Sequence, residues 1–186
     1  MNNNLYEFSK GPTNLKFHKT MYVIFSVLKY LNLTVIAFAL VIGFSLNNVG
    51  YFFAVLFLAS YLLSWYVARF FYNYYDYSYV DGSIRVIKVQ HNKTRKLVVN
   101  FDAKNIVAIG KVFGETFEKH HKNKAVKKYY ACADNATESD IRIYFSENGV
   151  NSLLIMPYDE LFISVLVRYT GVRKLDKDFT ETKQND

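Results

Sequence analysis

One uncharged stretch constrains this sequence more than any other feature. The 39 residues from Tyr30 to Ala68 contain no Asp, Glu, Lys, Arg or His. A helix that crosses a bilayer needs about 20 apolar residues, so this stretch is long enough for two crossings. Asn47-Asn48-Val49-Gly50 interrupts it with residues that favour a turn. The sequence therefore predicts a transmembrane hairpin over residues 21–72, with helices at residues 21–46 and 51–72.

Basic residues predict how this hairpin is oriented. Lys10, Lys16 and Lys19 precede the first helix and Arg69 lies at the end of the second, whereas residues 47–50 carry no charge. Because cytoplasmic loops are enriched in Lys and Arg, we expect a two-span protein of the cell membrane with both termini in the cytoplasm. Residues 1–20 are expected to form a loosely structured cytoplasmic segment. The single cysteine, Cys132, excludes an internal disulfide and is typical of a reducing compartment.

After residue 72 the pattern changes to short strands. Apolar and aromatic alternation predicts strands at residues 75–79, 84–89, 97–101, 105–109, 128–133, 141–145 and 152–156. Asp81-Gly82 and Asn148-Gly149 are typical of tight hairpin turns. A helix is predicted from Pro157, with an apolar stripe that ends before Gly171. Residues 73–172 are thus expected to be one small cytoplasmic domain, and residues 173–186 a flexible tail.

The segments that carry a family resemblance are turn and core signals: residues 74–82 and 83–88, the Arg95-Lys96 step, residues 143–149, and Pro157. In this order they resemble a pleckstrin-homology-like (PH-like) barrel. The whole chain is similar to an uncharacterised family, a domain of unknown function, of small clostridial-type membrane proteins with two helices and a PH-like C-terminal domain. The resemblance implies an α+β membrane protein, in which a seven-stranded PH-like β-barrel or sandwich follows the hairpin and is capped by a C-terminal helix. It implies no catalytic or binding residue.

Positive charge is concentrated in the first half of the predicted domain. Six basic residues lie between Arg85 and Lys104 beside one acid, Asp102, and residues 111–128 add six lysines against two acids. One interpretation is contact with anionic lipid headgroups or with a membrane protein partner, at about 1 kcal/mol per basic residue. The other is a solvated domain with lysine-rich turns. The candidate contact residues are Lys93, Arg95, Lys96, Lys119, Lys122, Lys124, Lys127 and Lys128.

Motifs that would indicate catalysis do not occur. The sequence has no phosphate-binding glycine loop, no Gly-x-Ser-x-Gly elbow and no His-Glu-x-x-His stretch. His120-His121 and Cys132 lack the spacing of metal ligands, and we expect Cys132 to be a core thiol in a strand. Aromatic residues are not interleaved with the lysines, which argues against nucleic-acid binding. We therefore expect a non-enzymatic protein without cofactor or metal.

Two functions of different kinds remain open. The preferred one is a membrane-anchored PH-like interaction module at the cytoplasmic face, which binds through its edge strands and basic loop. The alternative is an accessory subunit of a transporter or membrane enzyme complex that acts through its hairpin. In the alternative, Lys29, Asn32, Ser60 and Ser64 would pack against partner helices, whereas in the preferred function Lys29 reaches the interface and the polar residues join the two helices.

Overall fold

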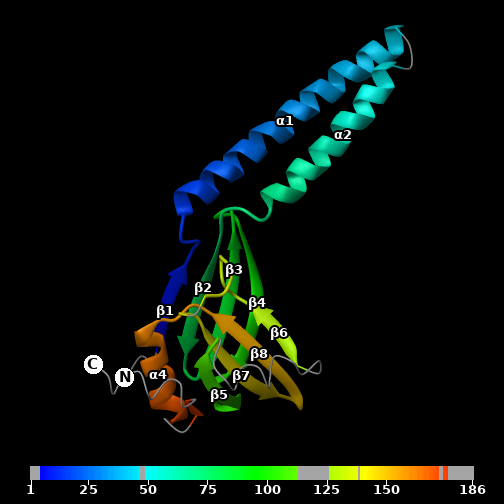
Figure 1. The fold of residues 1–186 in the computed structure, drawn as a ribbon. Coiled ribbons are helices and arrows are strands. Elements are labelled where there is room, and N and C mark those ends of the chain that lie inside the picture. The colour runs from blue at the N-terminus through cyan, green and yellow to red at the C-terminus, as the bar shows by residue number, and fades with distance from the viewer. Residues whose placement is uncertain (1–4, 47–48, 113–125, 138, 172–173, 176–186) are drawn as a thin grey trace. The chain divides into compact units, whose positions relative to one another are not determined.

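The computed structural model describes residues 5–46, 49–112, 126–137, 139–171 and 174–175 (Figure 1). The chain divides into two compact units. One is the hairpin, Pro12–Asn73, and the other combines Met1–Gly11 with Tyr74–Asp186. The second unit, called the domain below, is therefore assembled from two separate pieces of the chain.

The hairpin consists of α1, Leu15–Leu46, and α2, Val49–Ala68. Both helices are long and apolar enough to cross a membrane. α1 begins before the predicted residue 21 because Asn14 caps it, with Asn14 Oδ1 accepting a 3.0 Å hydrogen bond from the Phe17 amide. α2 begins at Val49, inside the predicted turn, and ends before the predicted residue 72.

One of the predicted polar contacts joins the two helices: Asn32 Nδ2 of α1 donates a 3.0 Å hydrogen bond to Ser60 Oγ of α2. Ser64 Oγ instead donates within α2, to the Ser60 carbonyl at 2.8 Å. Asn32 and Ser64 are only 2% and 3% exposed. The hydrogen-bonding groups of these residues are thus used inside the hairpin.

Small residues allow the helices to approach closely near the turn. A Cβ atom built on Gly50 would lie 2.6 Å from the Ala39 carbonyl oxygen and would also clash with the Gly43 backbone. Close approach at small residues is a common packing mode of membrane helices.

The described strands of the domain form two four-stranded sheets. Sheet A has the order β1-β2-β3-β4, and sheet B has the order β5-β7-β8-β6, in which only β6 and β8 are a parallel pair. The elements are β1 Leu5–Lys10, β2 Asn73–Val80, β3 Ser83–Gln90, β4 Thr94–Asp102, η1 Ala103–Asn105, β5 Ile106–Lys111, β6 Lys127–Tyr130, β7 Ile141–Glu147, β8 Val150–Met156 and α4 Glu160–Thr170. The α+β class is confirmed. The predicted seven-stranded barrel or sandwich is confirmed only in part, because the described strands form two four-stranded sheets rather than one seven-stranded barrel.

The extra strand is β1, and α1 begins at Leu15, so the prediction of a loosely structured segment over residues 1–20 is wrong for its described part, residues 5–20. β1 pairs antiparallel with β2 from Leu5↔Val80 to Lys10↔Tyr75. The Phe8 ring stacks on Tyr77 with centroids 4.5 Å apart and meets Phe162 edge-on at 5.4 Å. The hairpin is therefore inserted between two neighbouring strands of sheet A.

The core lies between the sheets and is closed by α4. Phe101 and Phe145 stack across it with ring centroids 3.8 Å apart, and Phe162 of α4 is fully buried. The predicted Asp81-Gly82 turn is confirmed by positive φ angles of 47° and 88°. α4 begins after the N-cap Asp159 rather than at Pro157.

Candidate functional site

One end of sheet A carries a concentration of positive charge. This end lies where the chain leaves β1 at Lys10 and enters β2, since Lys10 pairs with Tyr75. The β3–β4 turn lies at the same end, because the Tyr74 hydroxyl donates a hydrogen bond to Asn92 Oδ1. We call the basic residues around this turn the basic end, namely Lys88, Lys93, Arg95 and Lys96.

Two lysines face each other at the basic end. Lys88 of β3 is directly opposite Lys96 of β4 in the pairing register, and like charges in such a pair destabilise a sheet. The Lys88 amine lies 6.0 Å from the centroid of the Tyr75 ring. Burial lowers the pKa of Lys88, and the charge of Lys96 lowers it further. A bound anion between these two amines would offset their repulsion and favour the charged form of Lys88.

Arg95 is the one member of the basic end with a described carboxylate partner. Its Nη2 atom lies 3.9 Å from Asp76 Oδ2 across the sheet. Both side chains are solvent-accessible, and such a pair contributes at most about 1 kcal/mol. The ion pair therefore leaves Arg95 available to a stronger anionic ligand.

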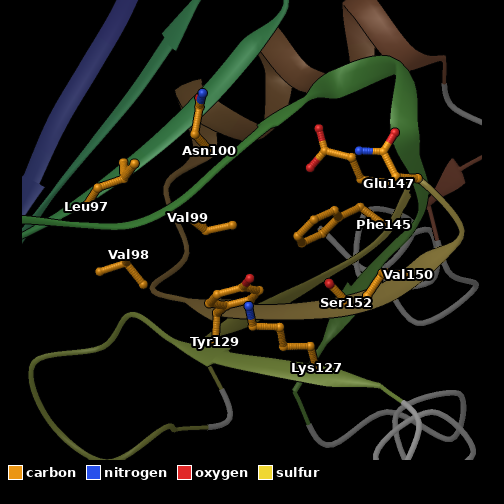
Figure 2. A pocket seen from close by; sticks show the side chains of 11 residues that line it. Leu97, Val98, Val99, Asn100, Lys127, Tyr129, Phe145, Glu147, Val150 and Ser152 are labelled. Atoms are coloured by element: carbon orange, nitrogen blue, oxygen red, sulfur yellow. The ribbon is translucent and has the colours of Figure 1, made fainter.

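A second candidate site is a pocket of about 420 Å³ where the two sheets separate (Figure 2). It lies between β4, the last strand of sheet A, and the strands β6, β7 and β8 of sheet B. We call this pocket the seam. Its lining residues are Leu97, Val98, Val99, Asn100, Lys127, Tyr129, Phe145, Glu147, Asn148, Val150 and Ser152.

Sheet B forms the floor of the seam with one face. Three of its four strands, β6, β7 and β8, contribute alternate residues, for example Phe145 and Glu147 on β7, and Phe145 belongs to the core face. The Lys127 amine lies 5.0 Å from the centroid of the Tyr129 ring. Figure 2 shows Lys127 and Glu147 on opposite sides of the Phe145 ring. The floor is thus aromatic in the middle, with a cation at one side and a carboxylate at the other.

The predicted contact residues do not share one surface. Lys93, Arg95 and Lys96 lie at the basic end, and Lys127 lies in the seam. Lys128 projects from the other face of β6, since it pairs with Leu153 of the smaller apolar cluster. The remaining three lie outside the described residues, namely Lys119, Lys122 and Lys124.

Sequence reasoning missed Lys88 and the seam. A signal for Lys88 exists, because a hairpin turn at residues 91–93 places Lys88 opposite Lys96. The seam has no comparable signal, since it depends on how two sheets of distant strands separate.

Cys132 is not placed as predicted. β6 ends at Tyr130, and Cys132 lies half-buried in the following loop. Burial raises the pKa of its thiol to about 12, and Asp140, whose Oδ2 lies 3.9 Å from the sulfur, contributes to the shift. No group of three metal-ligating side chains occurs within the described ranges. His120 and His121 fall outside those ranges.

Comparison with known proteins gives one match. The family model described as Bacterial PH-like domain (DUF6106) matches residues 15–173. The match begins at the first residue of α1 and covers both helices and nearly all of the domain except β1. No curated protein and no solved structure matches significantly. The predicted resemblance to an uncharacterised family with a PH-like domain is confirmed.

Proposed function

Because this chain belongs to the bacterial PH-like domain family DUF6106, we propose that it is a non-enzymatic interaction module anchored in the cell membrane. The α1–α2 hairpin is the anchor, and the PH-like domain lies at the cytoplasmic face. The basic end, with Lys88 and Lys96 opposed, is the observation that carries this proposal. Its ligand is the anionic headgroup layer of the bilayer.

The connections between the hairpin and sheet A are short in sequence. Four residues, Gly11 to Asn14, join β1 to α1, and four residues, Arg69 to Tyr72, join α2 to β2. Each connection therefore has five Cα–Cα steps of at most about 3.5 Å, so it spans no more than about 18 Å. Short connections to a bilayer-spanning hairpin support the proposal that this end of sheet A contacts the headgroups.

The charge arrangement suits a headgroup phosphate. Each basic residue near an anionic leaflet contributes about 1 kcal/mol, and the contribution falls off within about 10 Å at moderate salt. A phosphate between Lys88 and Lys96 would replace the repulsion of the two amines by attraction. Lys93 and Arg95 add charge around the same turn.

The hairpin itself gives less support to the alternative, an accessory subunit of a membrane complex. Asn32, Ser60 and Ser64 are hydrogen-bonded within the hairpin rather than presented outward. Lys29 is half-buried, and its amine lies 4.5 Å from the centroid of its neighbour Tyr30. Replacing residues 15–68 with an unrelated two-helix anchor separates the two functions. A module keeps its partners and phenotype after the exchange, and an accessory subunit loses them.

The test of headgroup contact uses the full chain in nanodiscs. Hydrogen exchange of the β3–β4 turn is compared between phosphatidylcholine nanodiscs and nanodiscs that also contain phosphatidylglycerol. We expect slower exchange with the anionic lipid, and loss of this difference at high salt. Equal exchange in both lipids would contradict the proposal.

A matched pair of variants assigns the effect to the basic end. Changing Lys88, Lys93, Arg95 and Lys96 to Gln removes four charges at the basic end and should abolish the lipid difference. Changing four other lysines removes the same charge elsewhere and should preserve it, namely Lys104, Lys127, Lys128 and Lys174. Alkaline carbonate extraction and reporter fusions to both termini test the anchor and its orientation independently.

A further inference from the structure

We propose that the seam binds an extended segment of a partner protein, which adds to β4 as a fifth strand of sheet A and places an acidic side chain beside Lys127. This inference rests on the proposed function as an interaction module, and it names the class of protein partner. The ligand of the basic end is lipid, so the two sites serve different ligands.

The first argument is that the main chain of β4 borders the seam. The four consecutive residues Leu97, Val98, Val99 and Asn100 all line it. Since neighbouring side chains of a strand point to opposite faces, four consecutive lining residues mean that the strand edge forms this wall. β4 is the last described strand of sheet A. Its outer N–H and C=O groups therefore face the pocket rather than another described strand.

An exposed strand edge recognises an extended peptide by repeated main-chain hydrogen bonds. A small organic ligand cannot match that repeat along four residues. The opposite boundary of the seam is β6, which is the last described strand of sheet B. An inserted segment would thus run between two strand edges and shield both.

The floor predicts which side chains the segment carries toward sheet B. Phe145 and Tyr129 lie there with rings stacked at a centroid distance of 6.4 Å. Leu97 and Val150 at the margins are 50% and 52% exposed, although both are large and apolar. Phe145 itself is only 2% exposed, so apolar side chains of the segment would mainly cover Leu97 and Val150, which are costly to leave in water.

Charge complementarity predicts where the segment carries an acidic side chain. Lys127 is exposed at one side of the floor, and Glu147 lies on the other side of Phe145 (Figure 2). No ion pair joins Lys127 to Glu147 among the residues that the structure describes. Residues i and i+2 of a strand project from the same face about 7 Å apart. The pattern expected of the segment is an acidic residue two positions from an apolar one.

The test is a peptide selection against the full chain in phosphatidylcholine nanodiscs. Random peptides of about eight residues, longer than a typical strand, are displayed on phage. Enriched peptides should show the acidic-x-apolar pattern without proline in the middle. Hydrogen exchange at Leu97–Asn100 should slow when such a peptide binds. Failure to enrich any peptide, or protection elsewhere only, would overturn the inference.

Two matched pairs of variants locate the bound peptide. Val150→Arg places a bulky charge at the margin of the seam and should weaken binding about tenfold or more. Val107→Arg makes the same change at a residue that is 51% exposed on β5, outside the seam, and should leave binding unchanged. Lys127→Glu should reverse the preference to peptides with Lys in place of the acid, whereas Lys128→Glu on the opposite face should not.

The experiment distinguishes failure of this inference from failure of the proposed function. If selected peptides bind equally to the Val150→Arg and Lys127→Glu variants, the seam is not their site and the inference fails. Lipid-dependent protection of the basic end in the same variants would show that the membrane-anchored module stands without it. If that protection is absent while the peptides bind as expected, the lipid proposal fails and the seam remains.

Discussion

The Tyr6 hydroxyl donates a 2.8 Å hydrogen bond to Asp159 Oδ1, although the two residues are 153 positions apart in the sequence. The same carboxylate caps α4 by accepting a 2.8 Å hydrogen bond from the Phe162 amide. The bond to the Asp159 carboxylate also raises the pKa of Tyr6. One carboxylate thus connects the strand before the hairpin to the helix at the end of the domain.

Removing the Tyr6 hydroxyl should destabilise the domain slightly. A partly exposed hydrogen bond to a charged group contributes about 1 kcal/mol, so Tyr6→Phe should lower the free energy of unfolding by about that amount. Asp159→Ala should cost about 1 kcal/mol more, because the helix cap is lost as well. Near-UV circular dichroism of the full chain in detergent measures both.

The control is Tyr130→Phe, at an exposed tyrosine of β6, which should have little effect. In the Asp159→Ala background, Tyr6→Phe should cost nothing further. A full cost in that background would mean that Tyr6 acts through other contacts.

The insertion of the hairpin between β1 and β2 predicts that the domain folds without it. Lys10 and Tyr75 are the last paired residues of the two strands. Replacing residues 11–74 with Asn-Gly should therefore join β1 to β2 by a tight turn and give a soluble domain. Size-exclusion chromatography and a cooperative thermal transition would check this.

A chain that starts at residue 73 is the informative comparison. It lacks β1, so Tyr77 and Phe162 lose the Phe8 ring that packs on them. We expect this shorter chain to unfold at lower temperature and to aggregate through the uncovered edge of β2. Equal stability of the two soluble chains would contradict the structural role of β1.

Prediction of an element from the sequence failed where the only signal is a short local pattern. β1 alternates Tyr6 and Phe8 with polar residues over only six positions, a pattern too brief to distinguish from an irregular segment. Its stability comes from Tyr77 and Phe162, which are far away in the sequence. The seven strands after the hairpin were predictable because Gly-containing turns and β-branched runs mark them. Their division into two sheets depends on the order of pairing, which no local pattern encodes.

Prediction of the candidate sites from the sequence was limited in the same way. Lys93, Arg95 and Lys96 were predictable as a basic cluster because they are neighbours in the sequence. Lys127 and Lys128 are neighbours as well, yet the period of a strand places them on opposite faces of sheet B. Charge counted along the chain therefore does not show which basic residues share a face.

Gly50 should be intolerant of larger side chains. Its backbone lies against Ala39 and Gly43, so Gly50→Leu must separate the helices, at a cost of about 1–3 kcal/mol. Cysteines introduced at Asn32 and Ser60, which are hydrogen-bonded in the wild type, should then form a disulfide more slowly. Val49→Leu, at an exposed position one residue away, is the control. Unchanged disulfide formation in the Gly50→Leu chain would contradict close packing there.

Cys132 should react slowly with alkylating reagents. Its pKa is raised from 9.0 to about 12, so the thiolate fraction at neutral pH is roughly a thousandfold smaller than for an ordinary thiol. Asp140→Asn should speed the reaction only in part, because burial is the larger cause of the shift. Mass spectrometry after timed exposure to iodoacetamide measures the rate. A rate equal to that of a free cysteine peptide would contradict this assignment.

Lys88 should destabilise the domain when no anion is bound. Its folded-state pKa is lowered by burial and by Lys96, so the unfolded chain binds more protons between that pKa and the usual lysine value of about 10.5. Stability must therefore rise with pH across this window, and the penalty is fully present below it. Lys88→Met, which keeps the apolar stem, should raise the melting temperature at neutral pH in a neutral detergent. The gain should disappear as the pH approaches about 10.5.

Anionic lipid should change the effect of Lys88 on stability from destabilising to stabilising. Phosphatidylglycerol should stabilise the wild-type domain and do little for the Lys88→Met variant, since the anion acts on the charged amine. Lys93→Gln, at an exposed residue of the turn, should not raise the melting temperature in neutral detergent. A Lys88→Met variant that melts lower than the wild type without anionic lipid would show that Lys88 is kept for packing and not for binding. A binding residue is expected to lower stability in the free protein and to restore it when the ligand is bound, whereas a structural residue is not.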